Sequence, residues 1–276
     1  MRILFVGDVF GTAGMEMMRQ HSGALLAAHK VDLLIVNCEN AADGFGITPI
    51  LAEELFDLGA HVLTTGNHVW DKVEVADYMK RADQDPRGRG RRLLRPANFP
   101  SGLAGVGHCE YVLHFGQRVA VLNLQGRRLM SQDNDNPFHV ADVVLKQIKA
   151  KVIVIDFHAE STYEKVGLGR YLDGRVTAVL GTHTHVPTAD EQILPRGTAY
   201  QTDVGMTGPY DGVNGISTEL ALERLSNGTS VEYQQATGDP RLCATLVECD
   251  PLTGKALSIR RILVAEDERQ KQPKRK

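Results

Sequence analysis

The sequence predicts an α/β fold in which two mixed sheets pack face to face and helices cover their outer sides. Short apolar runs alternate with helical patterns in the first half, which indicates βαβ units with parallel strands. Hairpin patterns in the second half indicate antiparallel pairs as well. The 276 residues are 42% hydrophobic and 24% charged, with a net charge of −3, which is enough apolar material for a substantial core.

The first half contains the strands and helices of the predicted βαβ units. Strands are expected at residues 2–8, 31–39 and 60–68, and helices at residues 14–29 and 48–59. Thr48 precedes Pro49 and is a suitable N-cap, because its hydroxyl can accept a hydrogen bond from a free backbone N–H. Gly59 is the stop signal of the same helix.

The second half adds two hairpins and two buried strands. Hairpins are expected at residues 110–125, turning at Gly116 and Gln117, and at residues 243–265, turning at residues 250–254; the buried strands are expected at residues 151–158 and 175–183. No linker rich in Pro or Ser divides the chain, so we predict a single domain over residues 1–267. Residues 268–276 are expected to form a disordered, charged tail.

Several classes of protein are disfavoured by composition. The N-terminus lacks the extended apolar region and cleavage site of a signal peptide, and no apolar run approaches membrane-spanning length. Four cysteines show neither a CxxC pair nor a disulfide-framework spacing: Cys38, Cys109, Cys243 and Cys249. We therefore expect free thiols in a reducing compartment, a cytoplasmic location and no membrane partner.

Polar side chains recur where the apolar runs end. Five separate runs end in a carboxylate, amide or imidazole: Asp8, Glu39, Asn67, His158, and the pair His183 and His185. A single polar group there could simply cap the next helix, but ligands of α/β sheets bind beyond the carboxyl ends of strands, and the recurrence favours one shared site. Oxygen and imidazole donors without cysteine suit Mn, Fe or Zn.

The stretch "GTHTHV" at residues 181–186 carries two histidines one residue apart. Side chains alternate along an extended strand, so His183 and His185 are expected on the same face, where they could converge on one or two metal ions. The alternative is that both histidines hydrogen-bond to loop backbone. We interpret Gly11, in the glycine-rich run after the first strand, as leaving room for this site rather than as a nucleotide-binding motif.

These motifs resemble a known family. "GD" at residues 7–8, "NCEN" at 37–40, "TGNH" at 65–68, "FHAE" at 157–160 and "GTHTH" at 181–185 occur in the order of the calcineurin-like metallophosphoesterase signature, over residues 1–205. "DNPF" at 135–138 and "TDVGMTGP" at 202–209 resemble the bacterial subgroup of 2′,3′-cyclic-nucleotide phosphodiesterases. The resemblance implies a four-layer α/β/β/α sandwich of two mixed sheets with flanking helices.

The resemblance also implies a dinuclear centre. One metal would be held by Asp8, Glu39, Asn40 and His185, and the other by Glu39, Asn67, His158 and His183. Fe or Mn are the expected metals, with Zn as an alternative. A metal-bridging hydroxide would attack the phosphorus, and His68 would donate a proton to the leaving group.

The chain departs from the general superfamily pattern at three positions. Phe10 stands where most members have a histidine, and Glu39 followed by Asn40 replaces the usual bridging aspartate. The acid that usually follows the GNH motif is absent, with Val69 in its place, so Asp71 is the candidate to orient His68. Asn40 would then replace the missing imidazole, which leaves the identity of the metal open.

The leading hypothesis is hydrolysis of a small-molecule phosphodiester or cyclic nucleotide. Alternatives are a phosphomonoesterase of the same chemistry and a metal-containing regulator that binds RNA or protein. An amidohydrolase is disfavoured because its HxH pair usually lies on the first strand, whereas the pair here, His183 and His185, comes late in the chain. The basic residues 80–95 are interpreted as a solvated surface loop, with an RNA-facing patch as the alternative, and we expect a homo-oligomer.

Overall fold

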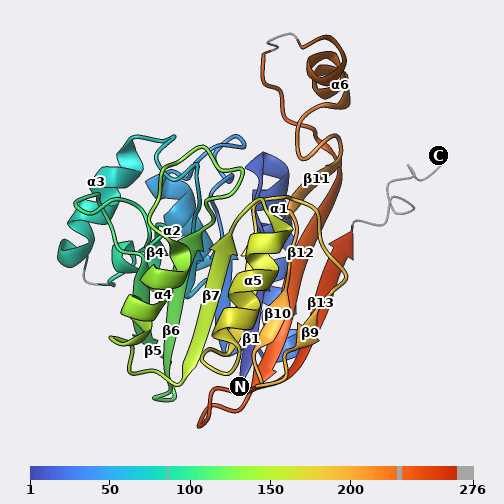
Figure 1. The fold of residues 1–276 in the computed structure, drawn as a ribbon. Helices are drawn as coiled ribbons and strands as arrows, with labels where there is room; N and C mark the ends of the chain where they lie inside the picture. The colour runs from blue at the N-terminus through green and yellow to red at the C-terminus, as the bar shows by residue number, and fades with distance from the viewer. Residues whose placement is uncertain (86, 229–231, 266–276) are drawn as a thin grey trace.

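Two sheets pack face to face in this computed structural model, which describes residues 1–85, 87–228 and 232–265 (Figure 1). The seven-stranded sheet has the order β11 (Gly208–Asp211), β12 (Gly238–Cys249), β1 (Arg2–Val6), β2 (Leu33–Asn37), β3 (Val62–Thr64) and β4 (Leu93–Leu94), with β13 (Ala256–Ala265) also paired to β12. The six-stranded sheet has the order β5 (His108–Val112), β6 (Arg118–Gln125), β7 (Val152–His158), β8 (Ala178–Thr182), β10 (Ala199–Gln201) and β9 (Gln192–Ile193). Both sheets are mixed.

Strand alternation explains the layers. Ile3 and Phe5 of β1 point into the core between the sheets, where they meet residues such as Val121 and Val154 of the second sheet. Leu4 and Val6 point the other way, toward the outer helices. Burying each such side chain contributes about 1.5–3 kcal/mol, so a strand with apolar residues on both faces is stable only between two layers.

Helices cover the outer face of each sheet. On the first sheet, α1 (Gly11–His29) and α2 (Pro49–Asp57) pack through residues such as Met18 and Leu55. On the second, α4 (Pro137–Leu145) and α5 (Thr162–Leu172) pack through residues such as Ala141 and Leu168. The predicted four-layer α/β/β/α sandwich is confirmed.

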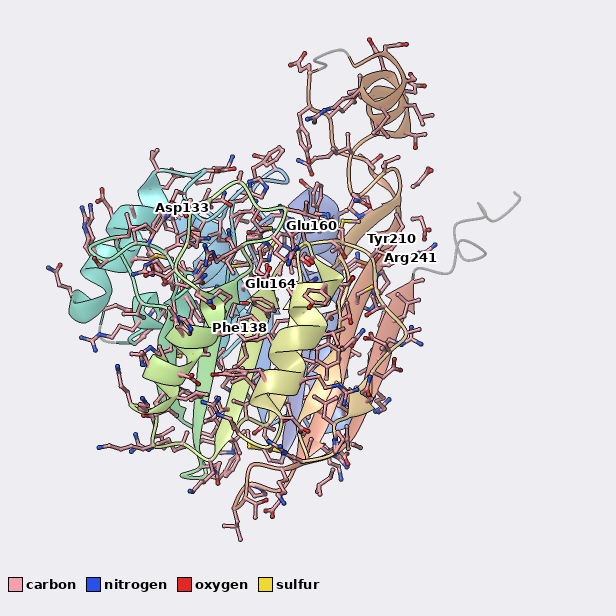
Figure 2. The ribbon with its side chains drawn as sticks, in the orientation of Figure 1. Asp133, Phe138, Glu160, Glu164, Tyr210 and Arg241 are labelled. Atoms are coloured by element: carbon pink, nitrogen blue, oxygen red, sulfur yellow. The ribbon has the colours of Figure 1, made fainter. Side chains whose placement is uncertain are left out.

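The remaining helices lie at the periphery. These are α3 (Glu74–Lys80), the 3₁₀ helices η1 (Arg81–Gln84) and η2 (Gly90–Arg92), and α6 (Thr218–Asn227). Figure 1 shows α6 on an arm that projects from the body between β11 and β12. Figure 2 shows Glu160 and Glu164 at the end of α5 that lies beside the carboxyl ends of the strands.

Helix α2 starts and stops where the sequence predicted. The Thr48 hydroxyl accepts a hydrogen bond from Leu51 N at 3.3 Å, and Gly59 adopts a φ of 104° that favours glycine. Helix α1 begins at Gly11, three residues earlier than predicted. Its N-cap is Phe10, whose side chain makes no capping hydrogen bond, so the sequence carries no start signal there.

The interpretation of Gly11 as space for the functional site is wrong. Gly11 has a φ of 57°, and a Cβ at this position would lie 1.9 Å from the Gln235 side chain. The glycine is required for the turn into α1 and for its contact with the projecting arm. The expected tail at residues 268–276 lies outside the described residues. Among the described residues no helix is long and apolar enough to cross a membrane.

Several arginines of the basic segment at residues 80–95 contact acidic and aromatic side chains of the same chain. Arg89 Nη2 donates to Asp57 Oδ1 at 2.6 Å, and Arg87 Nη2 donates to Glu53 Oε2 at 2.7 Å. Arg92 lies over the ring of Phe56, with 5.1 Å from its Cζ to the ring centroid. These contacts support a structural role for the segment over an RNA-facing one.

Candidate metal centre

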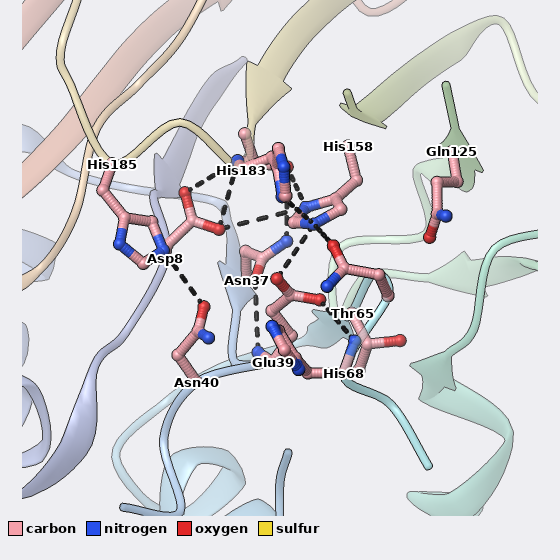
Figure 3. Close-up of polar contacts among 12 residues, drawn as sticks. Asp8, Asn37, Glu39, Asn40, Thr65, His68, Gln125, His158, His183 and His185 are labelled. Atoms are coloured by element: carbon pink, nitrogen blue, oxygen red, sulfur yellow. Dashed lines mark hydrogen bonds and ion pairs between the residues drawn. The ribbon is translucent and has the colours of Figure 1, made fainter. Parts of the chain in front are cut away.

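The polar residues at the strand ends come together at the carboxyl edges of both sheets (Figure 3). Three parallel strands of the first sheet and two of the second end at this point, which is why residues far apart in sequence meet here. The predicted residues and their places are Asp8 after β1, Glu39 and Asn40 after β2, Asn67 and His68 after β3, His158 at the end of β7, and His183 and His185 after β8. All lie at this edge.

The most compact donor group surrounds Nε2 of His158. Glu39 Oε1 and Asn67 Oδ1 each lie 2.9 Å from this nitrogen, and His183 Nδ1 lies 3.0 Å from it. Because Nε2 carries at most one proton, it cannot satisfy all three neighbours by hydrogen bonding. A cation among these atoms would satisfy all of them, so the donor set fits a metal ion.

The outer nitrogens of these histidines are fixed by acceptors of the protein. His158 Nδ1 lies 3.0 Å from the Thr182 hydroxyl, which donates to Asp156 Oδ1 at 2.7 Å. His183 Nε2 lies 3.3 Å from Glu160 Oε2. With their outer nitrogens protonated, both imidazoles present an unprotonated nitrogen to the centre, which is the form that binds a metal.

Two of these supporting residues were missed in the sequence. Asp156 is a fully buried carboxylate within the apolar run of β7, and that placement was a signal that could have found it. Glu160 follows His158 by two residues in the "FHAE" motif. The search for donors at strand ends did not identify Asp156 or Glu160, because each supports a histidine of the site instead of facing the centre itself.

A second, looser donor group lies on the other side of Glu39. His185 Nε2 is 3.3 Å from Asn40 Oδ1, and its Nδ1 is 3.1 Å from the carbonyl oxygen of Asn214. Asn40 Nδ2 donates to Gly44 O at 2.8 Å, which turns the Asn40 amide oxygen toward the site. Asp8 accepts a hydrogen bond from His183 N at 3.1 Å. Among carboxylates and imidazoles of the described residues, only Glu39, His158 and His183 share one centre.

Burial and charge set the protonation of the cluster. Burial alone would raise the pKa of Glu39, but the neighbouring His158 lowers it to about 2. Glu39 in turn raises the pKa of His158 despite burial. Burial and the nearby His158 lower the pKa of His183 to about 3, and burial raises the pKa of Asp8 well above its usual range. A negative Glu39 beside a neutral His183 is a suitable combination for cation binding.

Glycine at position 66 allows the close approach of these groups. A Cβ on Gly66 would lie 2.3 Å from His158 Nε2 and 2.4 Å from Glu39 Oε2. Any side chain would therefore displace a donor. The glycine of the "TGNH" motif is required because the β3 loop passes directly against the cluster.

The prediction that strand alternation places the two histidines on one face is wrong, although both do reach the site. Strand β8 ends at Thr182, and His183 and His185 have φ values of 101° and 65°. Both lie in the left-handed region, which is unfavourable for residues with a Cβ. They face the site because the backbone adopts these conformations after β8 ends, and the surrounding structure must hold them.

A buried ion pair holds this loop. Asp203 Oδ2 accepts hydrogen bonds from the backbone N and hydroxyl of Thr184, at 3.1 and 2.8 Å, and Thr184 lies between the two histidines. Lys165 Nζ donates to the same oxygen at 2.6 Å and to Thr182 O at 2.8 Å. Lys165 is 1% exposed and Asp203 is fully buried. The pair ties α5 to the last residue of β8 and to the middle of the strained loop.

Lys165→Met is expected to lower the free energy of unfolding by about 3–5 kcal/mol, because it leaves the Asp203 carboxylate buried without its cation. Urea unfolding of the metal-free protein measures this. The double variant Lys165→Met/Asp203→Asn should recover part of the loss, since the Asn oxygen still accepts from Thr184. Lys146→Met, at an exposed lysine, is the matched control. A loss below about 1 kcal/mol for Lys165→Met would contradict this role of the pair.

His68 lies at the edge of the cluster and is not one of its compact donors. Its Nδ1 is 2.7 Å from Asp71 Oδ2, so Asp71 takes the orienting role suggested by the sequence. Its backbone N donates to Glu39 Oε2 at 3.2 Å, and its ring makes an edge contact with Phe45. The rings of Phe10 and His185 make an edge contact, with centroids 5.5 Å apart. Phe10 therefore packs against His185 but offers no ligand atom of its own.

Comparisons with known proteins identify relatives over nearly the whole chain. The sequence model of a family described as YmdB-like protein matches residues 4–262. The 2′,3′-cyclic-nucleotide 2′-phosphodiesterase of Bacillus subtilis strain 168 is 45% identical over 269 residues, which cover 97% of this chain and 98% of that protein.

Two solved structures have similar folds over nearly the whole chain. A hypothetical protein from Thermus thermophilus superposes with a TM-score of 0.88 at 36% identity, covering 97% of this chain and 100% of the other. A protein of Mycoplasma pneumoniae described as a novel phosphatase also gives a TM-score of 0.88, at 31% identity, covering 99% of this chain and 97% of the other.

Proposed function

The chain belongs to the YmdB-like protein family, within the metallophosphoesterase superfamily, and on that premise we propose that it hydrolyses 2′,3′-cyclic nucleotides or related phosphodiesters. The observation that carries the proposal is the convergence of Glu39, Asn67 and His183 on one nitrogen of His158. The Bacillus relative, named for this reaction, supports the choice of substrate class.

We propose that each chain binds two metal ions and that Fe or Mn are the preferred metals. In this proposal both sets of donors share Glu39. One set adds Asn67, His158 and His183, and the other adds Asp8, Asn40 and His185. When bound, such a pair of ions activates a water, binds phosphoryl oxygens and stabilises an in-line displacement. The second set supports the proposal through the Asn40–His185 contact and the amide orientation that Gly44 imposes.

The proposed role of His68 is to give a proton to the leaving oxygen. Asp71 occupies its Nδ1, so Nε2 is the nitrogen left to face a substrate. The side chain is 28% exposed, unlike the fully buried His158. A residue in this position can reach a substrate without being committed to metal binding.

A phosphomonoesterase of the same chemistry is the second candidate, supported by the description of the Mycoplasma relative as a phosphatase. The oriented His68–Asp71 pair favours an enzyme over a regulator that only binds RNA or protein. The test is turnover by protein prepared without oxygen and loaded with Mn or Fe. We expect a nucleoside 2′,3′-cyclic phosphate to be hydrolysed faster than a nucleoside monophosphate. Faster monoester turnover would favour the second candidate, and no turnover of either would favour the regulator.

A further inference from the structure

A pocket of about 920 Å³ opens between the segment that follows β6 and the first two turns of α5. Its lining includes Arg127, Arg128, Gln132, Asn136, Phe138 and Tyr163. Figure 2 shows Phe138 on the α4 side of this region and Glu164 on α5, with Asp133 above them. We call it the α5 pocket. Its volume is that of a site for a small molecule or one unit of a polymer.

The α5 pocket lies beside the proposed metal centre. Gln125, the last residue of β6, is in register with His158 on the neighbouring strand, and strands of one sheet are about 4.8 Å apart. Gln125 Nε2 donates to Gln132 Oε1 at 2.9 Å, and Gln132 lines the pocket. On the other side, Glu160 contacts His183 and is followed closely by Tyr163 of the pocket wall. The path from His158 of the metal centre to Gln132 of the pocket therefore crosses one strand spacing, to Gln125, and one hydrogen bond.

The pocket presents two arginines and an exposed aromatic ring, beside the carboxylates of Asp133 and Glu164. The backbone N–H groups of Arg127 and Arg128 donate to the Glu164 carboxylate at 3.0–3.1 Å, which anchors the segment and satisfies that acid. Within the described part of the chain, neither guanidinium has a carboxylate partner. Tyr163 is 79% exposed, and Arg128 lies over its ring at 5.6 Å from the centroid.

This combination matches a nucleotide of single-stranded RNA. Bases of single strands stack on aromatic rings and on arginine planes, and arginine binds phosphate through paired N–H groups. Amide side chains of Gln132 and Asn136 add hydrogen-bonding groups for the edge of a base. The pocket therefore suits a base and its phosphate together.

We propose that the α5 pocket binds the nucleotide that precedes a terminal 2′,3′-cyclic phosphate, so that RNA ends carrying this group are better substrates than free cyclic mononucleotides. This inference rests on the proposed function. A cyclic mononucleotide has a single phosphate, and that phosphate belongs at the metal centre. The exposed guanidinium groups of Arg127 and Arg128 at the neighbouring pocket can bind a second anionic group, and the phosphate that links a preceding nucleotide is such a group.

The test compares a nucleoside 2′,3′-cyclic phosphate with a dinucleotide that ends in the same cyclic phosphate. We expect the wild-type kcat/KM to be about 10-fold or more higher for the dinucleotide, since stacking of one base on an aromatic ring corresponds to about 5- to 150-fold. Tyr163→Leu should remove most of this preference, and Tyr163→Phe should keep it. Arg128→Ala should raise KM for the dinucleotide about 10-fold.

Two controls isolate the pocket. Arg170→Ala removes an exposed arginine of α5 outside the pocket and should leave both substrates unchanged. The cyclic mononucleotide should be hydrolysed equally by wild type, Tyr163→Leu and Arg128→Ala. Equal losses on both substrates, or no wild-type preference, would overturn the proposal while leaving the proposed function intact.

A binding measurement separates this inference from the chemistry of the site. Titration calorimetry with the inactive Glu39→Gln protein and a short oligoribonucleotide ending in a cyclic phosphate should show tighter binding than to the same protein carrying Tyr163→Leu. If wild-type protein turned over neither substrate but this difference in binding remained, the proposed function would be wrong and the proposed role of the α5 pocket would be supported. Identical binding by both proteins would show that the α5 pocket does not bind the oligoribonucleotide.

Discussion

Glu39→Gln is expected to abolish turnover while the chain still folds. The substitution removes the carboxylate that we propose is shared by both donor sets, and it keeps nearly the same volume in a position that is 1% exposed. Loss of supporting residues around metal ligands costs about 10–100-fold in metal affinity, so loss of the shared ligand should exceed about 100-fold. Metal titration by calorimetry and circular dichroism of the metal-free protein measure the two parts of this expectation.

Glu53→Gln provides a matched control for Glu39→Gln. Glu53 is an acid of α2 bound to Arg87 and Tyr78, remote from the strand ends, so the same chemical change should leave metal affinity and turnover unchanged. If Glu39→Gln kept wild-type turnover with metal at saturating concentration, Glu39 would not be the shared ligand.

His68→Ala is expected to retain metal and to lose about 10²–10⁴-fold in turnover of a nucleoside 2′,3′-cyclic phosphate. The alkoxide that leaves from ribose is a poor leaving group and needs a proton as the bond breaks. Since the only side-chain hydrogen bond of His68 among the described residues goes to Asp71 and not to the donor group around His158, its removal should leave metal content at the wild-type level. Elemental analysis of the purified variant checks this point.

The comparison of leaving groups distinguishes proton donation from positioning. A p-nitrophenyl diester releases an already stable anion, so His68→Ala should slow it much less than it slows the cyclic nucleotide. Both substrates meet the same protein preparation, which controls for folding and metal content. The surface variant His114→Ala should affect neither substrate. Equal losses on both substrates for His68→Ala would assign His68 a positioning role instead.

The layers and the site's location could be predicted because they follow from strand periodicity. Ile3 and Leu4 face opposite layers in the way that an apolar strand between two layers requires. The donors gather because parallel strands end at one edge, and each donor directly follows its strand. The recurrence of Asp8, Glu39 and His158 at such ends was visible in the residues themselves.

The parts that could not be predicted depend on backbone outside regular strands. The two histidines of the "GTHTH" motif reach the site through positive φ angles rather than through strand alternation, and the Asp203–Lys165 pair that holds them joins a loop and a helix far apart in sequence. Gly66 is required by a close approach that has no sequence signature beyond the glycine itself. Such features arise from tertiary contacts, which periodicity does not encode.

Whether two metal ions share Glu39 can be determined by anomalous scattering from crystals of protein prepared without oxygen, combined with elemental analysis. We expect two anomalous peaks per chain, roughly 3.5–4 Å apart on either side of the Glu39 carboxylate. One peak should lie beside His158 and His183, and the other beside Asn40 and His185. A single fully occupied peak remote from His158 and His183 would contradict the dinuclear centre.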